Sequence, residues 1–276
     1  DLVEIIVFDA FSAADTVSKA DGGQFDGNIT MAGTLATTGN ATFSGEIITS
    51  TSGTSNVRIG ENAGDAIASG GNYNTVVGDE AGTAITTGDG NTAVGFEALK
   101  TEDAHGFNTA VGYQTLKMQN AGAEGYNVAV GHQAGTAITT GIANVIVGAL
   151  AGDAMTTGQI NVLVGTNTGS GLTEGLENVA MGHNSLLVDT KGQRSTALGY
   201  GTLAAQNFTS LTEVYNTAVG FNAGAAVTTG IYNTTVGGLA GDALTDADYN
   251  IAIGGLALSS DTKGSNSVAV GYRALT

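Results

Sequence analysis

The sequence contains no cysteine, no proline and no tryptophan, and only 12% of its 276 residues are charged. Without cysteine the chain has neither a disulfide framework nor a thiolate metal site. Basic residues are also scarce, with 8 Lys and Arg against 25 Asp and Glu, for a net charge of −17. So acidic a chain repels nucleic-acid phosphates and anionic lipid, and we expect no nucleic-acid partner. No apolar run approaches the roughly 18 residues of a membrane span, so we expect no membrane insertion.

Glycine is abundant, with 44 residues, and much of it belongs to a phrase that recurs along the chain. Examples are GNTAVGFEAL at 90–99, GFNTAVGYQTL at 106–116 and SNSVAVGYRAL at 265–275. Nine of the twelve steps between successive copies are 17 residues, and the other three are longer, which predicts a fixed coil with loops bulging from one corner. The shared glycines, which we call the anchor glycines, number 13: Gly60, Gly78, Gly95, Gly112, Gly131, Gly148, Gly165, Gly182, Gly199, Gly220, Gly237, Gly254 and Gly271.

The residues around each anchor glycine predict a short β-strand that ends in a turn. The preceding residue is always apolar, as in Val94 and Val111, and the residue three before it is Thr or β-branched. The fourth residue before it is Asn in eleven copies, which predicts a ladder of amides bonded to the backbone at one corner. One 17-residue unit cannot bury a core alone, but stacked units can. The sequence therefore predicts an all-β fold, a parallel β-solenoid of about 13 rungs, roughly 60 Å long at about 4.8 Å per rung.

Two kinds of rung alternate in blocks. Some carry Gly four residues after the anchor and an apolar residue three further on, as in Gly82 and Ile85. Others carry Leu at the first of these positions, as in Leu99 and Leu116, and lack the later apolar residue or place it irregularly. We interpret the two kinds as alternative ways to fill the same core volume.

Small residues two before the anchor glycine alternate with the apolar residue next to it. We expect the apolar column to line the core and the small column to point outward, where another backbone can approach closely. On this interpretation the small residues form the interface of a homotrimer, at Ala93, Ala110, Ala129, Ala180, Ala197, Ala218, Ala252 and Ala269.

The phrases NTAVGYQTL, NVAVGHQAG and NSVAVGYRAL resemble the head repeats of YadA-type trimeric autotransporter adhesins and similar repeats in bacteriophage tail fibres. The resemblance covers residues 56–275 and implies a β-roll with three chains to a rod and a role in adhesion or receptor binding. The period of 17 departs from the adhesin period of about 14 to 15, and no coiled-coil stalk or membrane anchor is present. These departures favour the phage-fibre branch and leave a bacterial surface adhesin or extracellular fibril as the alternative.

Residues 1–50 differ from the repeats, so we divide the chain into an N-terminal attachment or shaft segment, 1–50, and a solenoid domain, 51–276. Within the first, Gly27, Gly33, Gly39 and Gly45 are six residues apart between short β-prone runs. This pattern resembles the winding segments of phage tail fibres, and a flexible Gly/Thr linker is the other interpretation.

The search for catalytic groups finds no convincing set, and we expect no enzyme activity, no cofactor and no metal site within one chain. His132 and His183 follow anchor glycines three rungs apart, too far to share a metal. In a trimer each could meet its symmetry copies at the axis, but we expect these rings to pack as aromatic-like groups. The adjacent acids Asp79–Glu80 and Glu102–Asp103 are interpreted as solvated turn carboxylates.

From the sequence we therefore expect a structural fibre protein that lies on a virion surface or otherwise outside the cell. It would be a segment of a homotrimeric tail fibre that contacts a host receptor or glycan through its longest insertions, residues 117–126 and 204–215. A polysaccharide-degrading solenoid and an ice-binding protein are the less favoured alternatives. The Thr-Thr phrases that suggest ice binding, such as TAITTG at 136–141, are interrupted by the Leu-type rungs.

Overall fold

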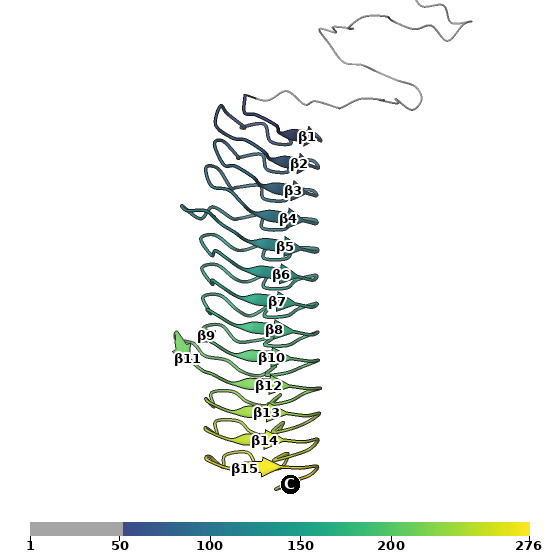
Figure 1. Cartoon of the computed structure of the whole chain (residues 1–276), viewed down its shortest axis with the longest axis vertical. Coiled ribbons are helices and arrows are strands. Elements are labelled where there is room, and N and C mark those ends of the chain that lie inside the picture. The colour runs from purple at the N-terminus through teal and green to yellow at the C-terminus, as the bar shows by residue number, and fades with distance from the viewer. Residues whose placement is uncertain (1–51) are drawn as a thin grey trace, which may run out of the picture. The chain divides into compact units, whose positions relative to one another are not determined.

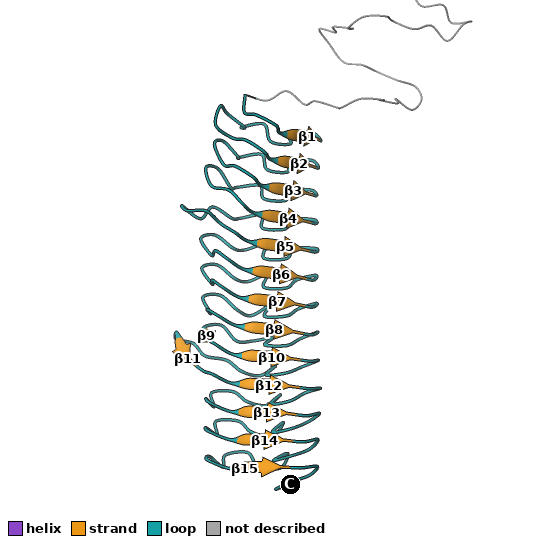
Figure 2. Cartoon of the chain, in the orientation of Figure 1, coloured by secondary structure: helices purple, strands orange, loops and turns teal. Residues whose placement is uncertain are grey.

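The structure, a computed structural model, describes residues 52–276, which form a parallel β-solenoid (Figure 1). Each of its 13 rungs contributes one three-residue strand to a 13-stranded sheet, and turns and loops make up nearly all the rest (Figure 2). These residues contain no helix, and hence none that could cross a lipid bilayer. The predicted fold class and repeat length are confirmed. The predicted N-terminal segment lies outside the described residues.

The strands follow one another up the sheet in chain order, apart from a two-stranded accessory sheet made by β9 and β11. They are β1 Val57–Ile59, β2 Thr75–Val77, β3 Thr92–Val94, β4 Thr109–Val111, β5 Val128–Val130, β6 Val145–Val147, β7 Val162–Val164, β8 Val179–Met181, β9 Gly192–Gln193, β10 Thr196–Leu198, β11 Thr212–Glu213, β12 Thr217–Val219, β13 Thr234–Val236, β14 Ile251–Ile253 and β15 Val268–Val270.

Each strand pairs with the next so that equivalent positions of the repeat lie side by side. Thr92 pairs with Thr109, and Val94 pairs with Val111. The sequence repeat is therefore converted into columns of like side chains along the rod, as a parallel ladder requires.

The anchor glycine is required for two reasons, which Gly95 illustrates. Its φ is +132°, a conformation that residues with a side chain rarely adopt. A Cβ atom on Gly95 would also lie 2.3 Å from the carbonyl oxygen of Gly112, the anchor of the next rung. The turn and the close stacking of rungs together exclude any larger residue.

The asparagine column forms the predicted ladder at the corner before each strand. The Asn91 side-chain oxygen accepts a hydrogen bond from the backbone N–H of Asn108, 3.0 Å away, in the next rung. The Asn74 amide nitrogen donates to the carbonyl of Gly88 at 2.8 Å. These side chains are buried, so the bonds satisfy backbone groups that water cannot reach.

The alanine column points in the opposite direction to the one that we expected. Ala93 and Ala110 are fully buried within a single chain, and so are Val76, Ile146 and Leu163, the larger apolar residues that take the same position in three other rungs. The prediction that these alanines form the trimer seam is therefore wrong, and the apolar residue next to the anchor glycine faces outward. The coil is narrow, and large side chains from the opposite wall, such as Leu99, already fill its interior. This leaves room for little more than a methyl group on most strands.

The two kinds of rung fill the core as interpreted. Leu99 and Leu116 are fully buried, and so are Ile85 and Ile138 from the other kind. A Cβ atom on Gly82 would lie 2.8 Å from Cδ1 of Ile85, so a side chain at the first position and an apolar side chain at the second exclude each other. The alternation is thus a packing requirement.

Candidate functional site

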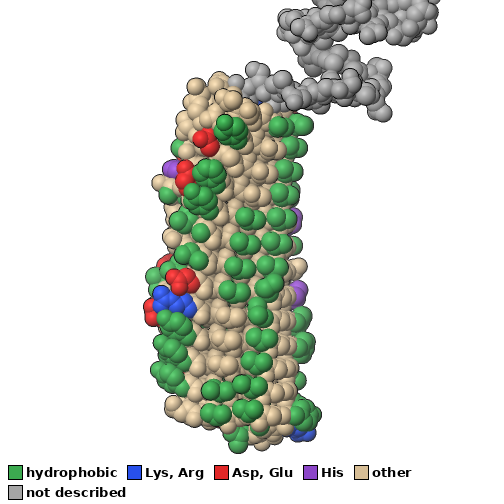
Figure 3. Space-filling model, viewed as in Figure 1, with side chains coloured by type: hydrophobic (Ala, Val, Ile, Leu, Met, Phe, Trp, Pro, Cys, Tyr) green, Lys and Arg blue, Asp and Glu red, His purple; other side chains and the backbone are tan. Residues whose placement is uncertain are grey.

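The outer face of the 13-stranded sheet is the largest exposed feature shared by all rungs. The first and third residues of every strand point outward, and most are Val, Ile or Thr. Val130 is 37% exposed, and Val270 in the last rung is 65% exposed. Figure 3 shows apolar side chains in columns along the rod, with charged side chains mostly at the margins of the face in view. The third residue of these strands is apolar in every rung, so this column is a continuous exposed apolar feature, of the kind that is typical of interaction surfaces.

Two columns of aromatic rings flank this face, and each column contains two stacks. At the turn after the strand, Tyr113 stacks between Phe96 and His132, with centroids 5.4 and 5.3 Å away. At the turn before the strand, Tyr232 stacks between Tyr215 and Tyr249. The rings stack on one another along the rod, so each stack borders the sheet face as a rigid rim.

Both histidines of the repeat belong to the first kind of stack. His132 lies against Tyr113 and His183 lies against Tyr200, each at 5.3 Å. The expectation that they pack as aromatic-like groups at the turn is confirmed within one chain, and packing between chains stays a prediction. A three-histidine site on a trimer axis stays the less favoured hypothesis.

The two long insertions bulge from the same side of the rungs (Figure 1). Residues 204–215 are partly held down, because Val214 is buried and β11 pairs with β9. Arg194 ties this insertion to the rung below, since its guanidinium pairs with Glu177 at 2.8 Å and also with Glu213. The exposed part is the tip around Leu211.

The insertion at 117–126 is more open. Met118 and Tyr126 are both more than half exposed, and Gly122 has no neighbouring atom within 4 Å of where a Cβ would lie. This loop therefore offers the more accessible apolar groups for a binding partner. Whether either loop binds one stays a prediction.

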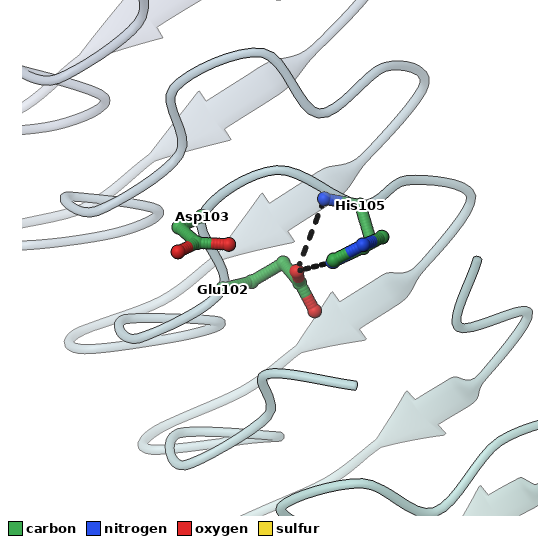
Figure 4. A group of neighbouring side chains, drawn as sticks. All are labelled: Glu102, Asp103 and His105. Carbon is green, nitrogen blue, oxygen red and sulfur yellow. Dashed lines mark hydrogen bonds and ion pairs between the residues drawn. The ribbon is translucent and has the colours of Figure 1, made fainter. Parts of the chain in front are cut away.

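A second candidate site lies in the loop between β3 and β4. Glu102, Asp103 and His105 place one ligand atom each within 4.8 Å of the others, and they are the sole such group of three among residues 52–276 (Figure 4). Glu102 is fully buried, so its interpretation as a solvated turn carboxylate is wrong. Burial raises the pKa of Glu102, and a hydrogen bond from the backbone N–H of His105 opposes that rise.

Sequence reasoning missed this site because it compared each acid with its immediate neighbour. Glu102 and Asp103 diverge, as expected of adjacent residues, but the loop turns His105 back toward Glu102 (Figure 4). A signal was present: Glu102 lies seven residues after Gly95, the position that other rungs give to a buried Ile, Met, Leu or Val.

A charged cluster on consecutive rungs has a structural role. Lys100 and Lys117 each donate to the Glu97 carboxylate at 2.6 Å, and Lys100 also pairs with Glu80. Hydrogen bonds from the two lysines lower the pKa of Glu97 to about 2. Bonds to Glu80 and Glu97 raise the pKa of Lys100 to about 12. The cluster therefore links three successive rungs through ion pairs.

Comparison with known proteins finds no matching family model, no matching curated protein and no matching solved structure. The likeness to adhesin and tail-fibre repeats therefore rests on the recurring phrases themselves.

Proposed function

We propose that this chain is a structural segment of a homotrimeric fibre, of the kind found in phage tails, which holds a binding end away from its base and contacts a host surface. The observation that supports the proposal is the outer sheet face, where the column next to the anchor glycine is apolar in all 13 rungs. Burying a side chain such as Val130, now 37% exposed, contributes about 0.5–1 kcal/mol. Because the gain is repeated on every rung, a long rod can exceed the entropy cost of association.

Assembly through this face replaces the alanine seam that the sequence suggested. The resemblance to adhesin and tail-fibre repeats implies three chains. The acidic residues outside the sheet face would keep assembled trimers apart in solution by charge repulsion. A parallel solenoid also suits a fibre mechanically, because its length grows by one strand spacing per repeat and every repeat contacts its neighbours alone.

Light scattering of the chain tests the proposal. A mass of about 82 kDa, three times the 27.3 kDa of one chain, is the expected result. Val147→Asp and Val164→Asp on the outer face should together reduce the mass to that of one chain and leave the β-sheet circular dichroism signal unchanged. The control is Thr157→Asp, an exposed loop position in the same region. A wild-type chain that stays at 27.3 kDa at high concentration would refute the fibre.

Ice binding is the second candidate, because the same outward columns contain two runs of threonine, Thr75, Thr92 and Thr109, then Thr196, Thr217 and Thr234. In the Thr-Thr phrases the first hydroxyl, such as that of Thr139, donates to a carbonyl of the next rung, whereas the second residue, such as Thr140, is exposed. A monomeric chain that produces thermal hysteresis would favour this candidate over the fibre.

A further inference from the structure

The seventh residue after each anchor glycine occupies the same place at the inner corner of its rung. In the Gly-type rungs this residue is apolar and buried, as in Ile85 and Met155. In the Leu-type rungs it is polar, and in four of them, at Glu102, Gln119, Asp189 and Gln206, it is equally buried. A polar group in this place needs partners, because burial without a hydrogen bond is unfavourable.

Three of these four polar residues find their partners inside the coil. Asp189 accepts from the Gln206 side chain at 2.6 Å and from the backbone N–H groups of Gly192 and Phe208. Gln206 also donates to Ser195 and accepts from Asn216. Gln119 accepts from the Asn127 amide and donates to the carbonyl of Gly141. A polar side chain at this position can therefore obtain its hydrogen bonds from within the chain.

Glu102 is the exception among the four. Its Oε1 accepts from the backbone N–H of His105 at 3.2 Å, the counterpart of the Asp189–Gly192 bond. Its Oε2 is buried and has no partner. A buried carboxylate with one oxygen left without a donor is strongly unfavourable as an anion, and a cation bound at its other oxygen, which faces His105, would offset the charge (Figure 4).

His105 completes the arrangement from the opposite side. Its Nδ1 lies 3.5 Å from Oε1 of Glu102 and makes no hydrogen bond, so two atoms of the kind that bind metal ions lie side by side (Figure 4). Two ligand atoms that are each about 2.1 Å from a tetrahedral zinc ion lie about 3.4 Å apart. The observed separation therefore fits a metal ion shared between the imidazole and the carboxylate.

We propose that Glu102, Asp103 and His105 bind a divalent first-row transition metal ion, with Zn²⁺ as the reference ion. Asp103 and His105 are half-buried, so the ion can enter from solvent and keep a water molecule as a further ligand. An imidazole nitrogen among the ligands favours such an ion over Ca²⁺ or Mg²⁺, which prefer oxygen alone.

The bound ion would lock one corner of three successive rungs. The Asp103 carbonyl accepts from the backbone N–H of Thr86 in the preceding rung, and the His105 carbonyl accepts from the Asn91 side chain. Gly106 donates to Glu124 in the following rung at 2.7 Å. Metal binding at this loop should therefore stabilise the solenoid without involving the outer sheet face.

Isothermal titration of the chelator-treated chain with ZnCl₂ tests the proposal, together with the visible absorption of bound Co²⁺. The expected result is one ion per chain, a tetrahedral Co²⁺ spectrum and a rise in melting temperature. Glu102→Gln keeps the volume of the side chain, and His105→Ala changes a half-exposed group, so both variants should fold. Each should weaken binding at least tenfold, since losing a supporting hydrogen bond alone weakens metal affinity by about 10–100-fold.

His132→Ala and Asp79→Asn are the matched controls, a histidine and an acid outside the cluster, and both should bind Zn²⁺ like the wild type. Absence of Zn²⁺ uptake by the folded wild-type chain would overturn the proposal. Uptake that survives in Glu102→Gln and His105→Ala but is lost in His132→Ala would overturn it in favour of another site.

Discussion

Ala110 and Val111 are neighbours in β4 whose side chains leave opposite faces of the sheet, so the same substitution at each should fail in different ways. Ala110 is fully buried and has Ala93 and Ala129 beside it in the adjacent strands. Val111 lies on the outer face. Arginine at each position therefore separates folding of the chain from assembly of the fibre.

Ala110→Arg places a long charged side chain in a space sized for a methyl group. Overpacking a core costs about 1–3 kcal/mol, and an unpaired buried charge adds about 3–5 kcal/mol. The sum approaches the stability of about 5–15 kcal/mol that is typical of a folded domain. We expect the variant to lose most of its β-sheet circular dichroism signal and its cooperative melting transition.

Val111→Arg leaves the charge in water, and the intrinsic stability of one chain should change by about 0.5 kcal/mol or less. We expect a folded chain of 27.3 kDa by light scattering that no longer assembles. Thr140→Arg, at an exposed loop position, is the control and should fold and assemble normally. The reasoning would be refuted if Ala110→Arg folded well and failed only in assembly, because that result would return the alanine column to the outer surface.

Three further substitutions test the packing and the electrostatics of the rungs. Gly237→Ala should lower the free energy of unfolding by more than about 2 kcal/mol, because φ at this position is +133° and a Cβ atom would lie 2.6 Å from the backbone of the next anchor glycine. The control Gly238→Ala adds a Cβ atom that meets no other atom within 4 Å, and its urea melt should match that of the wild type. Thr235→Val should raise the melting temperature, because it removes a buried hydroxyl that has no hydrogen-bond partner. Thr115→Val should lower the melting temperature, because the Thr115 hydroxyl donates to the carbonyl of Gly131 at 2.7 Å. Because the pKa of Glu97 falls from 4.5 to about 2, its ion pairs stabilise the chain above pH 4.5 and are lost as the pH falls through 2. Glu97→Gln should therefore flatten the melting temperature between these pH values, and an unchanged acid dependence would contradict the role of the lysine pairs.

The repeat alone determined the architecture because each rung interacts mainly with the rungs beside it. The Asn column, the β-branched positions and the glycine in its unusual conformation are local requirements that recur with the same spacing. The sequence also indicated that Leu99 and Ile85 fill the core in their two kinds of rung, and both side chains are fully buried.

The direction of the alanine column could not be obtained in this way. Alternation along a strand shows that Ala110 and Val111 lie on opposite faces, but not which face is inside. That depends on how the other 14 residues of a 17-residue rung close around the strand, and the side chains of the opposite wall leave space for a methyl group alone.

The same reasoning applies to the candidate metal site. The sequence by itself determined that Glu102 occupies the position that the Gly-type rungs give to an apolar side chain, and it determined the solenoid that surrounds it. Only the tertiary structure decided that this carboxylate lacks the partners that Asp189 has, and that a turn of three residues brings His105 against it. The reason is physical: repeat spacing sets which residues stack, whereas burial and hydrogen bonding depend on how the loop folds back in three dimensions.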